Sequence, residues 1–524
     1  MDYKVLVTTS GIGPRLGEIT KYTNKSLVRV GKKPALSYVI EAYPVDTPFV
    51  ITIGYFGEHV RDFLTLTYPE RNFTFVTIDT FVGDGSSLGY SMLQASEHLQ
   101  CPFIFHAADT IVKDTILPPT ENWIGVYKGD DASPYASLSV LGGGKLVFNE
   151  KGAINFDYIH IGLVGIFEYE SYWSELQKLY DKNPNDQSLN DCKVLAKMMD
   201  KGSKFSTTLF PEWYDTGNAA ALGRARTHIA DHFDNLDKLE ESIFLFDTFV
   251  IKFFHDEKIV AERVARAKSL EGLVPKIEGV KRNFYRYSYA KGRTYADVAT
   301  PATFGYFLQW SKKNLWKEVH EVDDETFKKV CLDFYLEKTK KRVAQFHAMN
   351  NLEDEAHVIN GEAVPTIATM LEMVDFNWLA NAPQYQFHGD FILDNTIKTA
   401  EGFTLIDWRH NFGGLLVSGD RYYDLAKLNH NLTVNHEIVS ANNFSIVVEA
   451  DNVVTCDILR KNNLVECQSI LFDFIASEGL DGNRVKLLTS IAWLNMSPLH
   501  HKPYDQFLYY FSKLHLWQAL RNLQ

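Results

Sequence analysis

Short apolar runs rich in β-forming residues alternate with segments of helical periodicity along the first 228 residues, and this alternation limits the fold more than any other feature of the chain. The strand-like runs lie at 4–9, 49–54, 73–78 and 103–108, and the helical segments include 35–43 and 87–99. Strands that alternate with helices are typical of α/β domains, in which helices cover a mostly parallel sheet. The sequence therefore predicts an α/β domain with a mostly parallel sheet over residues 1–228.

The pattern changes in the rest of the chain. Residues 229–241 are polar and charged, which predicts a linker. A strand-like run (242–254), a helical segment (259–272) and an aromatic strand-like run (283–292) follow, and long helical patterns come after them. This order predicts a bilobed α+β domain over residues 242–524, with a cleft between its lobes. Two domains also suit the length, because 524 residues exceed the size at which a single core keeps growing.

Charge and cysteine content exclude several classes of function. The net charge of -13 argues against a broad surface for nucleic acid or for an anionic membrane. The five cysteines are scattered and form no zinc or redox motif, so we expect buried thiols in a reducing cytoplasm. The sequence shows no signal peptide and no apolar stretch near the ~20 residues that span a bilayer. We therefore expect a cytoplasmic protein with small-molecule substrates and no nucleic-acid or membrane partner; its oligomeric state stays open.

A pair of glycines follows the first strand-like run in a pattern suited to phosphates. Gly11 and Gly13 stand just after the run. Two basic residues, Arg15 and Lys25, follow them in the sequence. Glycines at the end of a parallel strand let successive backbone N–H groups turn toward an anion, and the two cations would add positive charge for a triphosphate. The glycine pair by itself fits an ordinary strand-to-helix turn equally well.

Two aspartates occupy positions suited to a metal ion. Asp109 follows the apolar run 102–108, so we expect it at the carboxyl end of a strand, where open α/β sheets bind their ligands. Asp215 lies in a W-Y-D-T-G segment. Mg²⁺ commonly uses only one or two protein carboxylates, with phosphates and water as its other ligands. The pair is therefore a candidate magnesium site, although a turn cap would explain Asp109 taken alone.

These motifs together resemble the signature of the sugar-1-phosphate and phosphocholine nucleotidyltransferases. The resemblance rests on G-x-G-x-R-L from Gly11, N-K-S-L from Asn24, the glycine-bearing loop 83–88 and the W-x-D-x-G segment. The chain departs from the family where Pro14 replaces a serine or threonine and where Asn24 replaces a proline. The resemblance implies a Rossmann-like (GT-A-like) fold. It also implies a reaction in which an acceptor phosphate attacks the α-phosphorus of an NTP and pyrophosphate leaves, with CTP or UTP as the most expected NTP. The implied roles are catalytic for Arg15 and Lys25, nucleotide- or acceptor-binding for Gly11, Gly13, Gly85, Ser86 and Lys151, and Mg²⁺-binding for Asp109 and Asp215.

A second motif lies between residues 386 and 408. His388 begins an H-G-D-x-x-x-x-N pattern that contains Asp390 and Asn395, and the apolar run after it ends at Asp407. This pattern resembles the catalytic loop of aminoglycoside phosphotransferases and choline kinases, which are small-molecule counterparts of the protein kinases. The resemblance implies a protein-kinase-like fold in which Asp390 accepts the proton of a substrate hydroxyl. In such a fold Asn395 and Asp407 would hold Mg²⁺ on the phosphates of ATP.

Three further residues fit the kinase resemblance. It implies that Lys252, in a strand-like run, binds the ATP phosphates and that Glu262, in the next helical segment, fixes this lysine. Any strand lysine near a helical glutamate would look similar, and no glycine-rich lid can be identified before Lys252. Asp424 resembles an aspartate that holds the catalytic loop by hydrogen bonds.

The two resemblances predict a bifunctional enzyme. Its kinase would phosphorylate a sugar, polyol or amino alcohol with ATP, and its transferase would couple the ester to an NTP, giving an NDP-linked donor of the kind used for bacterial capsule and other surface polysaccharides. Two alternatives stay open: one domain is a degenerate nucleotide-binding or scaffolding module, or the chain is a sensor without catalysis. His160 fits a buried histidine as well as a ligand contact, and the aromatic run 284–289 fits a strand better than a cage for a quaternary ammonium group.

Overall fold

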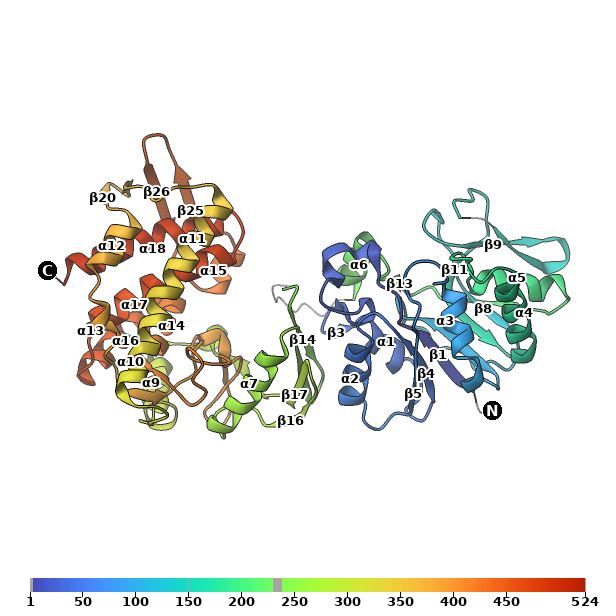
Figure 1. Cartoon of the computed structure of the whole chain (residues 1–524), viewed down its shortest axis with the longest axis horizontal. Helices are drawn as coiled ribbons and strands as arrows, with labels where there is room; N and C mark the ends of the chain where they lie inside the picture. Colours follow the sequence, from blue (N-terminus) through green and yellow to red (C-terminus); the bar gives the residue numbers. More distant parts are fainter. Residues whose placement is uncertain (1–2, 150, 230–237, 524) are drawn as a thin grey trace. The chain divides into compact units, whose positions relative to one another are not determined.

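The computed structural model describes residues 3–149, 151–229 and 238–523. Its contacts divide the chain into two compact units (Figure 1). The first consists of the residues up to Val260 together with Glu278–Tyr287, and the second consists of Ala261–Ile277 and the residues from Ser288 onward.

Within the described ranges, the first unit is built on a nine-stranded mixed sheet. Its main path runs β10-β9-β11-β6-β1-β4-β5, and β8 joins β11 to β12 beside this path. The strands are β1 (Lys4–Thr8), β4 (Phe49–Ile53), β5 (Phe73–Thr77), β6 (Phe103–Ala107), β8 (Trp123–Tyr127), β9 (Ser137–Leu141), β10 (Lys145–Asn149), β11 (Tyr158–Ile166) and β12 (Ser206–Leu209).

The predicted strands and helices of this unit are present, but the sheet is mixed rather than mostly parallel. The strands β6, β1, β4 and β5 run parallel to one another. The long strand β11 reverses the direction, because it pairs antiparallel with β6, β8 and β9. The sequence pattern identifies strands without their directions, and this explains the difference.

Helices cover both faces of the sheet (Figure 1). Because successive side chains of a strand point to opposite faces, Val5 and Val7 of β1 pack in one core cluster and Leu6 packs in the other. The first cluster includes residues of two helices, α1 (Ala35–Glu41) and α2 (Gly57–Thr67). The second includes residues of α3 (Leu88–Gln94), α4 (Tyr169–Lys182) and α5 (Asp191–Asp200). This layering leaves the carboxyl ends of the parallel strands at one edge.

A smaller sheet that the sequence assigns to the second domain packs in the core of the first unit. Its order is β14-β15-β17-β16, with β14 (Glu241–Leu245), β15 (Phe249–Phe254), β16 (Ile277–Val280) and β17 (Phe284–Ser288). The ring of Phe63, on α2, lies 5.4 Å from the ring of Phe244 and 6.1 Å from that of Phe284. The N–H of Leu245 donates to the carbonyl of Lys32 at 2.9 Å.

The second unit therefore does not begin at residue 242, where the sequence predicts the start of the second domain, because the first unit continues to Val260. The aromatic side chains of the smaller sheet are buried against α2, so most of this sheet belongs to the first unit. The same burial accounts for the aromatic run: Phe284, Tyr285 and Tyr287 are buried side chains of β17. Of the predicted linker, residues 230–237 lie outside the described residues.

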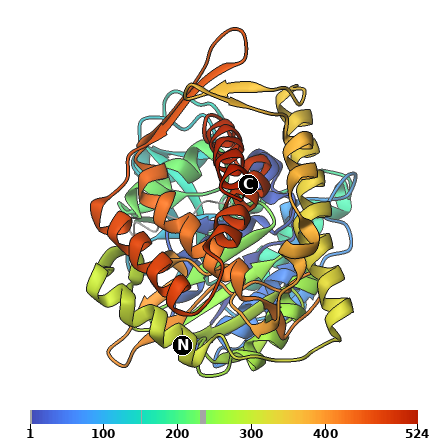
Figure 2. The ribbon, with the colours of Figure 1, turned by 90° about the vertical axis from the view of Figure 1, so that its left-hand side faces the viewer.

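The second unit is mainly helical, and it faces the viewer in Figure 2. The C-terminal helix α18 packs on α17, which also packs on α14, and their apolar faces share one core cluster. The hairpin of β25 (Phe444–Val448) and β26 (Val453–Ile458) projects at the top of the view. Most of α7 (Glu257–Ser269) belongs to this unit. The other helices are α8 (Tyr295–Val298), α9 (Pro301–Asn314), α10 (Asp324–Leu332), the π-helical turn η5 (Asp333–Glu337), α11 (Lys338–Asn350), α12 (Ile367–Met373), α13 (Phe376–Ala380), α14 (Arg421–Thr433), α15 (His436–Ser440), α16 (Asn462–Ser477), α17 (Gly482–Met496) and α18 (Tyr504–Arg521).

Small sheets complete the second unit and frame the predicted catalytic loop. They have the orders β18-β22-β23, β20-β19-β26-β25 and β21-β24. Their strands are β18 (Arg293–Thr294), β19 (His357–Ile359), β20 (Glu362–Val364), β21 (Gln384–Gln386), β22 (Thr396–Lys398), β23 (Phe403–Leu405), β24 (Ser418–Asp420), β25 (Phe444–Val448) and β26 (Val453–Ile458). Among the described residues, no helix is both long enough and apolar enough to cross a membrane.

Candidate active sites

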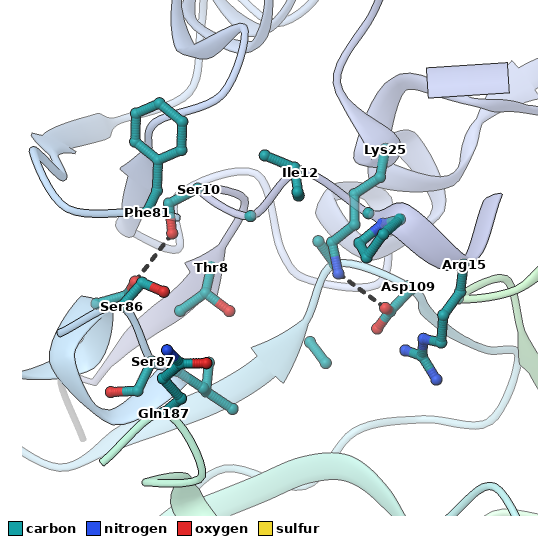
Figure 3. Close-up of a pocket in the computed structure, with 18 of the residues that line it drawn as sticks. Thr8, Ser10, Ile12, Arg15, Lys25, Phe81, Ser86, Ser87, Asp109 and Gln187 are labelled. Carbon is teal, nitrogen blue, oxygen red and sulfur yellow. Dashed lines mark hydrogen bonds and ion pairs between the residues drawn. The ribbon is translucent and has the colours of Figure 1, made fainter. Parts of the chain in front are cut away.

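A cavity of about 570 Å³ lies at the carboxyl end of β1 (Figure 3). The loop from Ser10 to Arg15 forms one wall, and Asp109 and Gly217 form part of another. Within the described part of the chain, the backbone N–H groups of Gly11, Ile12 and Gly13 donate no hydrogen bond to the backbone. This wall therefore offers N–H groups to an anion, as the sequence predicts for a phosphate-binding loop.

The loop closes tightly on Lys25. Gly13 has a φ of 65°, and a Cβ on it would lie 2.8 Å from the Cβ of Lys25, so this position requires glycine. The buried Asn24 side chain donates to the carbonyls of Thr9 (2.8 Å) and Tyr55 (2.6 Å). Its Oδ1 accepts from the backbone N–H of Ser26 at 2.9 Å. Where the family has a proline, this chain thus uses an asparagine to tie the turn that carries Lys25 to the glycine loop.

The two predicted metal-binding aspartates converge on one point. Strand β7 (Thr110–Val112) pairs antiparallel with β13 (Trp213–Asp215), and this pairing brings Asp109 and Asp215 to the same end of the two strands. A Cβ on Gly217 would lie 3.0 Å from Oδ2 of Asp109, 3.1 Å from Oδ1 of Asp215 and 3.2 Å from Nη2 of Arg15. Two carboxylates and a guanidinium therefore surround a point that only the missing side chain of a glycine leaves open.

Basic side chains and hydrogen bonds set the charge of this cluster. Lys25 Nζ lies 2.9 Å from Oδ2 of Asp109, and Figure 3 shows the amine of Lys25 and the guanidinium of Arg15 both directed toward this carboxylate. Burial raises the pKa of Asp109, but Lys25 and Arg15 more than offset it, so this pKa lies below its usual value. Asp215 accepts hydrogen bonds from the N–H of Gly217 (2.9 Å) and the hydroxyl of Tyr135 (2.9 Å).

The donor set fits a hard divalent cation. Burial, followed by the charge of Asp109, raises the pKa of Asp215, so the two carboxylates lie close enough to influence each other. Carboxylate oxygens are the ligands that Mg²⁺ prefers, and one or two of them suffice when phosphates supply the rest. Asp109 and Asp215 are therefore the residues that would hold Mg²⁺ in this unit.

The other predicted residues of the first unit divide into two groups. Ser86 lines the cavity, and its hydroxyl donates to the carbonyl of Gly83 at 2.7 Å. Gly85 and Lys151 are not among the residues that line it. His160 is buried, and its Nε2 lies 2.8 Å from a carboxylate oxygen of Asp191, which favours the interpretation as a paired buried histidine.

The second motif forms a compact loop in the second unit. The Nδ2 group of Asn395 donates to the carbonyl (3.0 Å) and to Oδ2 (3.1 Å) of Asp390, so these two predicted residues are in direct contact. The N–H of Ile406 donates to the carbonyl of Asn395 at 2.9 Å, which brings the following Asp407 to the same loop. Asp407 has a φ of 58°, in the left-handed region that residues with a side chain seldom adopt. Such strain is often found at functional sites.

Two buried charged residues hold this loop. The carboxylate of Asp424 accepts from the N–H groups of His388 (2.8 Å) and Gly389 (2.7 Å), as the resemblance implies. Arg266, on α7, is fully buried and donates to the carbonyls of His388, Phe387, Arg409 and Leu416. The loop is therefore fixed from two helices, and this rigidity orients Asp390.

Cations also surround the predicted catalytic carboxylate. Lys427, on α14, places Nζ 2.8 Å from Oδ1 of Asp390. Burial raises the pKa of Asp390, but Lys427, His388 and Arg409 outweigh this effect and hold the pKa well below its usual value. Arg263 lies 3.3 Å from Asp407. Asp390 is therefore ionised at neutral pH and able to accept a hydrogen bond from a hydroxyl.

The second loop also fits a divalent cation. Because Asn395 uses its amide N–H groups on Asp390, its carbonyl oxygen is the atom left to bind a metal. Asp407 follows Ile406, whose N–H donates to the carbonyl of Asn395, and adds a carboxylate next to this contact in the chain. The residues that would hold Mg²⁺ in this unit are therefore Asn395 and Asp407, as the resemblance implies.

The predicted pair of Lys252 and Glu262 stays a prediction. Lys252 is buried on β15 in the first unit, while Glu262 lies on α7 in the second unit, where Oε2 accepts from Nδ2 of Asn411 at 2.6 Å. The strands β14 and β15 form a hairpin whose turn, between Phe246 and Phe249, contains no glycine. This agrees with the absence of an identifiable glycine-rich lid in the sequence.

Sequence reasoning missed several residues that support the sites. Tyr135 and Arg266 bind groups about 80 and more than 100 residues away along the chain, and no local pattern marks them. In the sequence, Asn24 stands out only as a departure from the family, which has a proline there. Lys427 follows Asp424 by three residues in a helical segment, and residues with this spacing lie on the same face of a helix. This spacing is the one sequence signal that could have placed Lys427 near the catalytic loop.

No protein-family model and no curated protein matches the chain. Among solved structures, the N-terminal part of the chain is similar to a Bacillus anthracis protein assigned as a glucose-1-phosphate thymidylyltransferase, with 20% identity, a TM-score of 0.39, and coverage of 45% of this chain and 98% of the other. It is also similar to the CTP:phosphocholine cytidylyltransferase of Streptococcus pneumoniae (16% identity, TM-score 0.37, 44% of this chain and 100% of the other). A third similar structure is the inositol-1-phosphate CTP transferase of T. maritima (16% identity, TM-score 0.34, coverage of 44% of this chain and 98% of the other).

Proposed function

We propose that the first unit is a nucleotidyltransferase that condenses a phosphate ester with an NTP and releases pyrophosphate. One observation carries this proposal: Asp109, Asp215 and Arg15 converge on the point above Gly217, at the wall of the cavity of about 570 Å³. Two carboxylates suited to Mg²⁺, with basic side chains beside them, are the groups that such a transfer requires. The resemblance of the sequence motifs to the nucleotidyltransferase signature supports the same activity.

Each group has a defined task in this proposal. The N–H groups of Gly11 and Gly13 bind the phosphates of the NTP, and Arg15 and Lys25 neutralise negative charge on them. The salt bridge between Lys25 and Asp109 holds the amine in place before substrate arrives. Mg²⁺ bound to Asp109 and Asp215 would supply further charge neutralisation at the phosphates. An oxygen of the acceptor phosphate attacks the α-phosphorus, and the bond to pyrophosphate breaks.

We further propose that the second unit is a small-molecule kinase that uses ATP. Asp390 accepts a hydrogen bond from the acceptor hydroxyl and takes its proton, and the rigid loop held by Asp424 and Arg266 keeps this carboxylate in place. Asn395 and Asp407 are the residues for Mg²⁺ on the ATP phosphates. The support is the direct contact of Asp390 with Asn395 and the left-handed conformation of Asp407.

The two activities would be consecutive steps. The kinase makes the phosphate ester, and the transferase, with CTP or UTP as its NTP, converts it to an NDP-linked donor of the kind used for bacterial surface polysaccharides. The alternative, in which one unit is a degenerate binding or scaffolding module, is favoured by Pro14 and by the hairpin turn without glycine.

A substrate matrix tests the proposal. The full-length protein is incubated with Mg²⁺, each of the four NTPs and a panel of phosphate esters, and pyrophosphate is measured. In parallel it is incubated with ATP and the matching alcohols, and ADP is measured. Both products are expected, and mass spectrometry should detect an NDP-conjugate when an alcohol, ATP and the preferred NTP are combined. Absence of pyrophosphate release with every ester would contradict the transferase proposal, and absence of ADP with every alcohol would contradict the kinase proposal.

A further inference from the structure

Basic side chains from three parts of the second unit lie close to Asp390 or to one another. Lys338 and Arg342 lie on α11, Arg409 follows the catalytic loop, and Lys427 lies on α14. We call these four residues the cation cluster. Lys427 is within 2.8 Å of Asp390, and the charges of Arg409 and Asp390 also act on Lys338.

An aromatic ring fixes two members of the cation cluster. Lys338 Nζ lies 4.2 Å from the centre of the Phe334 ring, and Arg409 Cζ lies 5.1 Å from it. Phe334 belongs to the π-helical turn η5, which directly precedes α11. A π-helical turn is rare and is frequently found at functional sites. Here it bears the ring between the two cations.

Two members of the cation cluster, Lys338 and Arg342, line a cavity of about 700 Å³. Lys338, Lys341 and Arg342 line this cavity together with Gln345 and two carboxylates, those of Asp333 and Glu337. Both carboxylates are on exposed residues, and Glu337 pairs with Lys340 at 3.1 Å. In the lining of this cavity, three positive side chains therefore outnumber two carboxylates.

Lys338 is half-buried, and a positive charge on its amine is unfavourable beside the other basic side chains when no anion is bound. Burial and the charges of Arg409, Arg342 and Lys427 lower the pKa of Lys338 to about 6. Burial and Arg409 also lower the pKa of Arg342. An anion bound among these groups would relieve their mutual repulsion, whereas a cationic alcohol would increase it.

We propose that the cation cluster binds an anionic group, a carboxylate or a phosphate, of the alcohol whose hydroxyl is placed at Asp390. This inference rests on the proposed kinase activity and names its substrate class: an anionic hydroxyl compound, rather than an amino alcohol or a neutral polyol. The hydroxyl oxygen forms a bond to the γ-phosphorus of ATP, the bond from that phosphorus to ADP breaks, and Asp390 takes the hydroxyl proton. The products are ADP and a phosphate ester that keeps the first anionic group.

The first test compares matched alcohols with the full-length protein. Glycerate, glycerol 3-phosphate, glycerol, ethanolamine and choline are each supplied with ATP and Mg²⁺, together with larger anionic, neutral and cationic sugars, and ADP is measured. The anionic members are expected to give the highest kcat/KM. A neutral or cationic alcohol that is phosphorylated with a higher kcat/KM than its anionic counterpart would overturn the inference and leave the kinase activity established.

The variant Arg342→Met then separates acceptor binding from ATP binding. It should raise KM for the best anionic alcohol at least about tenfold while KM for ATP stays unchanged, because a charge-assisted hydrogen bond is lost on the acceptor side. The matched control is Lys340→Met, on the same helix and outside the lining of the cavity, which should change neither value. An increase in KM for ATP alone would mean that the cluster serves the nucleotide and would refute the inference.

A binding measurement covers the case in which no alcohol gives ADP. That result would contradict the proposed kinase function, and the cluster is then tested with inorganic phosphate as the probe. The thermal midpoint of the full-length wild type and of Lys340→Met should rise with phosphate more than that of Arg342→Met. Equal shifts in all three proteins would overturn the anion site independently of any activity.

Discussion

A single methyl group at Gly217 should disable the first unit without unfolding it. The Cβ of Gly217→Ala would lie 3.0 Å from Asp109 Oδ2, 3.1 Å from Asp215 Oδ1 and 3.2 Å from Arg15 Nη2. An ordinary contact begins near 3.4 Å, so each of these polar groups must retreat by roughly 0.2–0.4 Å. The methyl group would also occupy the point between the carboxylates and remove water from both.

The expected loss follows from the displacement of three groups at once. Misplacement of catalytic groups by about 1 Å can lower a rate by about 10²-fold, so smaller shifts of two carboxylates and a guanidinium should lower kcat/KM for pyrophosphate release by about 10- to 100-fold. Gly217 does not have a positive φ, so the alanine variant should fold normally. ADP formation by the second unit should be unchanged.

A matched control is available six residues along the chain. Gly223 lies inside α6 (Ala219–His228), and a Cβ on it would meet no atom within 4 Å. Gly223→Ala should therefore keep full activity and gain about 0.5–1 kcal/mol of stability from its helical position. Pyrophosphate release is measured for both variants over a range of ester and NTP concentrations. Equal activity of Gly217→Ala and wild type would refute the assignment of the point above Gly217 as the reaction centre.

Three further changes have defined outcomes. Asn24→Ala leaves the carbonyls of Thr9 and Tyr55 without their donor, so the free energy of unfolding of the first unit should fall by about 2–4 kcal/mol in a urea titration; an unchanged midpoint would contradict this. Arg266→Met removes the donor for several carbonyls of the catalytic loop, so ADP formation should fall while pyrophosphate release persists; loss of both activities, or of neither, would speak against this role. Lys338→Met removes an amine whose pKa is about 6 in the folded protein. Between pH 6 and 10 the unfolded wild type binds a proton that the folded wild type has released, so the free energy of unfolding of the wild type should rise with pH. In urea titrations from pH 6 to 9, the midpoint of the variant should therefore rise less with pH than that of the wild type.

The strands of the first sheet and the main site aspartates were predictable because their signals are local. Asp109 follows an apolar run, so its place at a strand end follows from the sequence, and the motif around Asp215 is a contiguous segment. Their convergence was expected from the resemblance and appears in the structure through the pairing of β7 with β13. The direction of β11 was not predictable, because apolar periodicity is the same for parallel and antiparallel strands.

The remaining features depend on partners far away along the chain. The aromatic face of β14, β15 and β17 indicates a buried strand, but its sequence does not say which helix it covers, and α2 supplies that surface. Tyr135 reaches Asp215 across 80 residues, and Lys427 reaches Asp390 from another helix. Such contacts require the tertiary structure. The resemblance implies binding roles for Gly85 and Lys151, but neither residue lines the cavity.

The most direct test of two separate sites measures both half-reactions on the same full-length proteins carrying Asp109→Asn or Asp390→Asn. We expect Asp109→Asn to lower pyrophosphate release at least about 100-fold, as the loss of a metal ligand should, and to keep ADP formation. Asp390→Asn should lower ADP formation by about 10²- to 10⁴-fold, as expected for a general base, and keep pyrophosphate release. If either variant retains the activity assigned to its own site, or if one substitution abolishes both reactions in a folded protein, two independent sites cannot account for the enzyme.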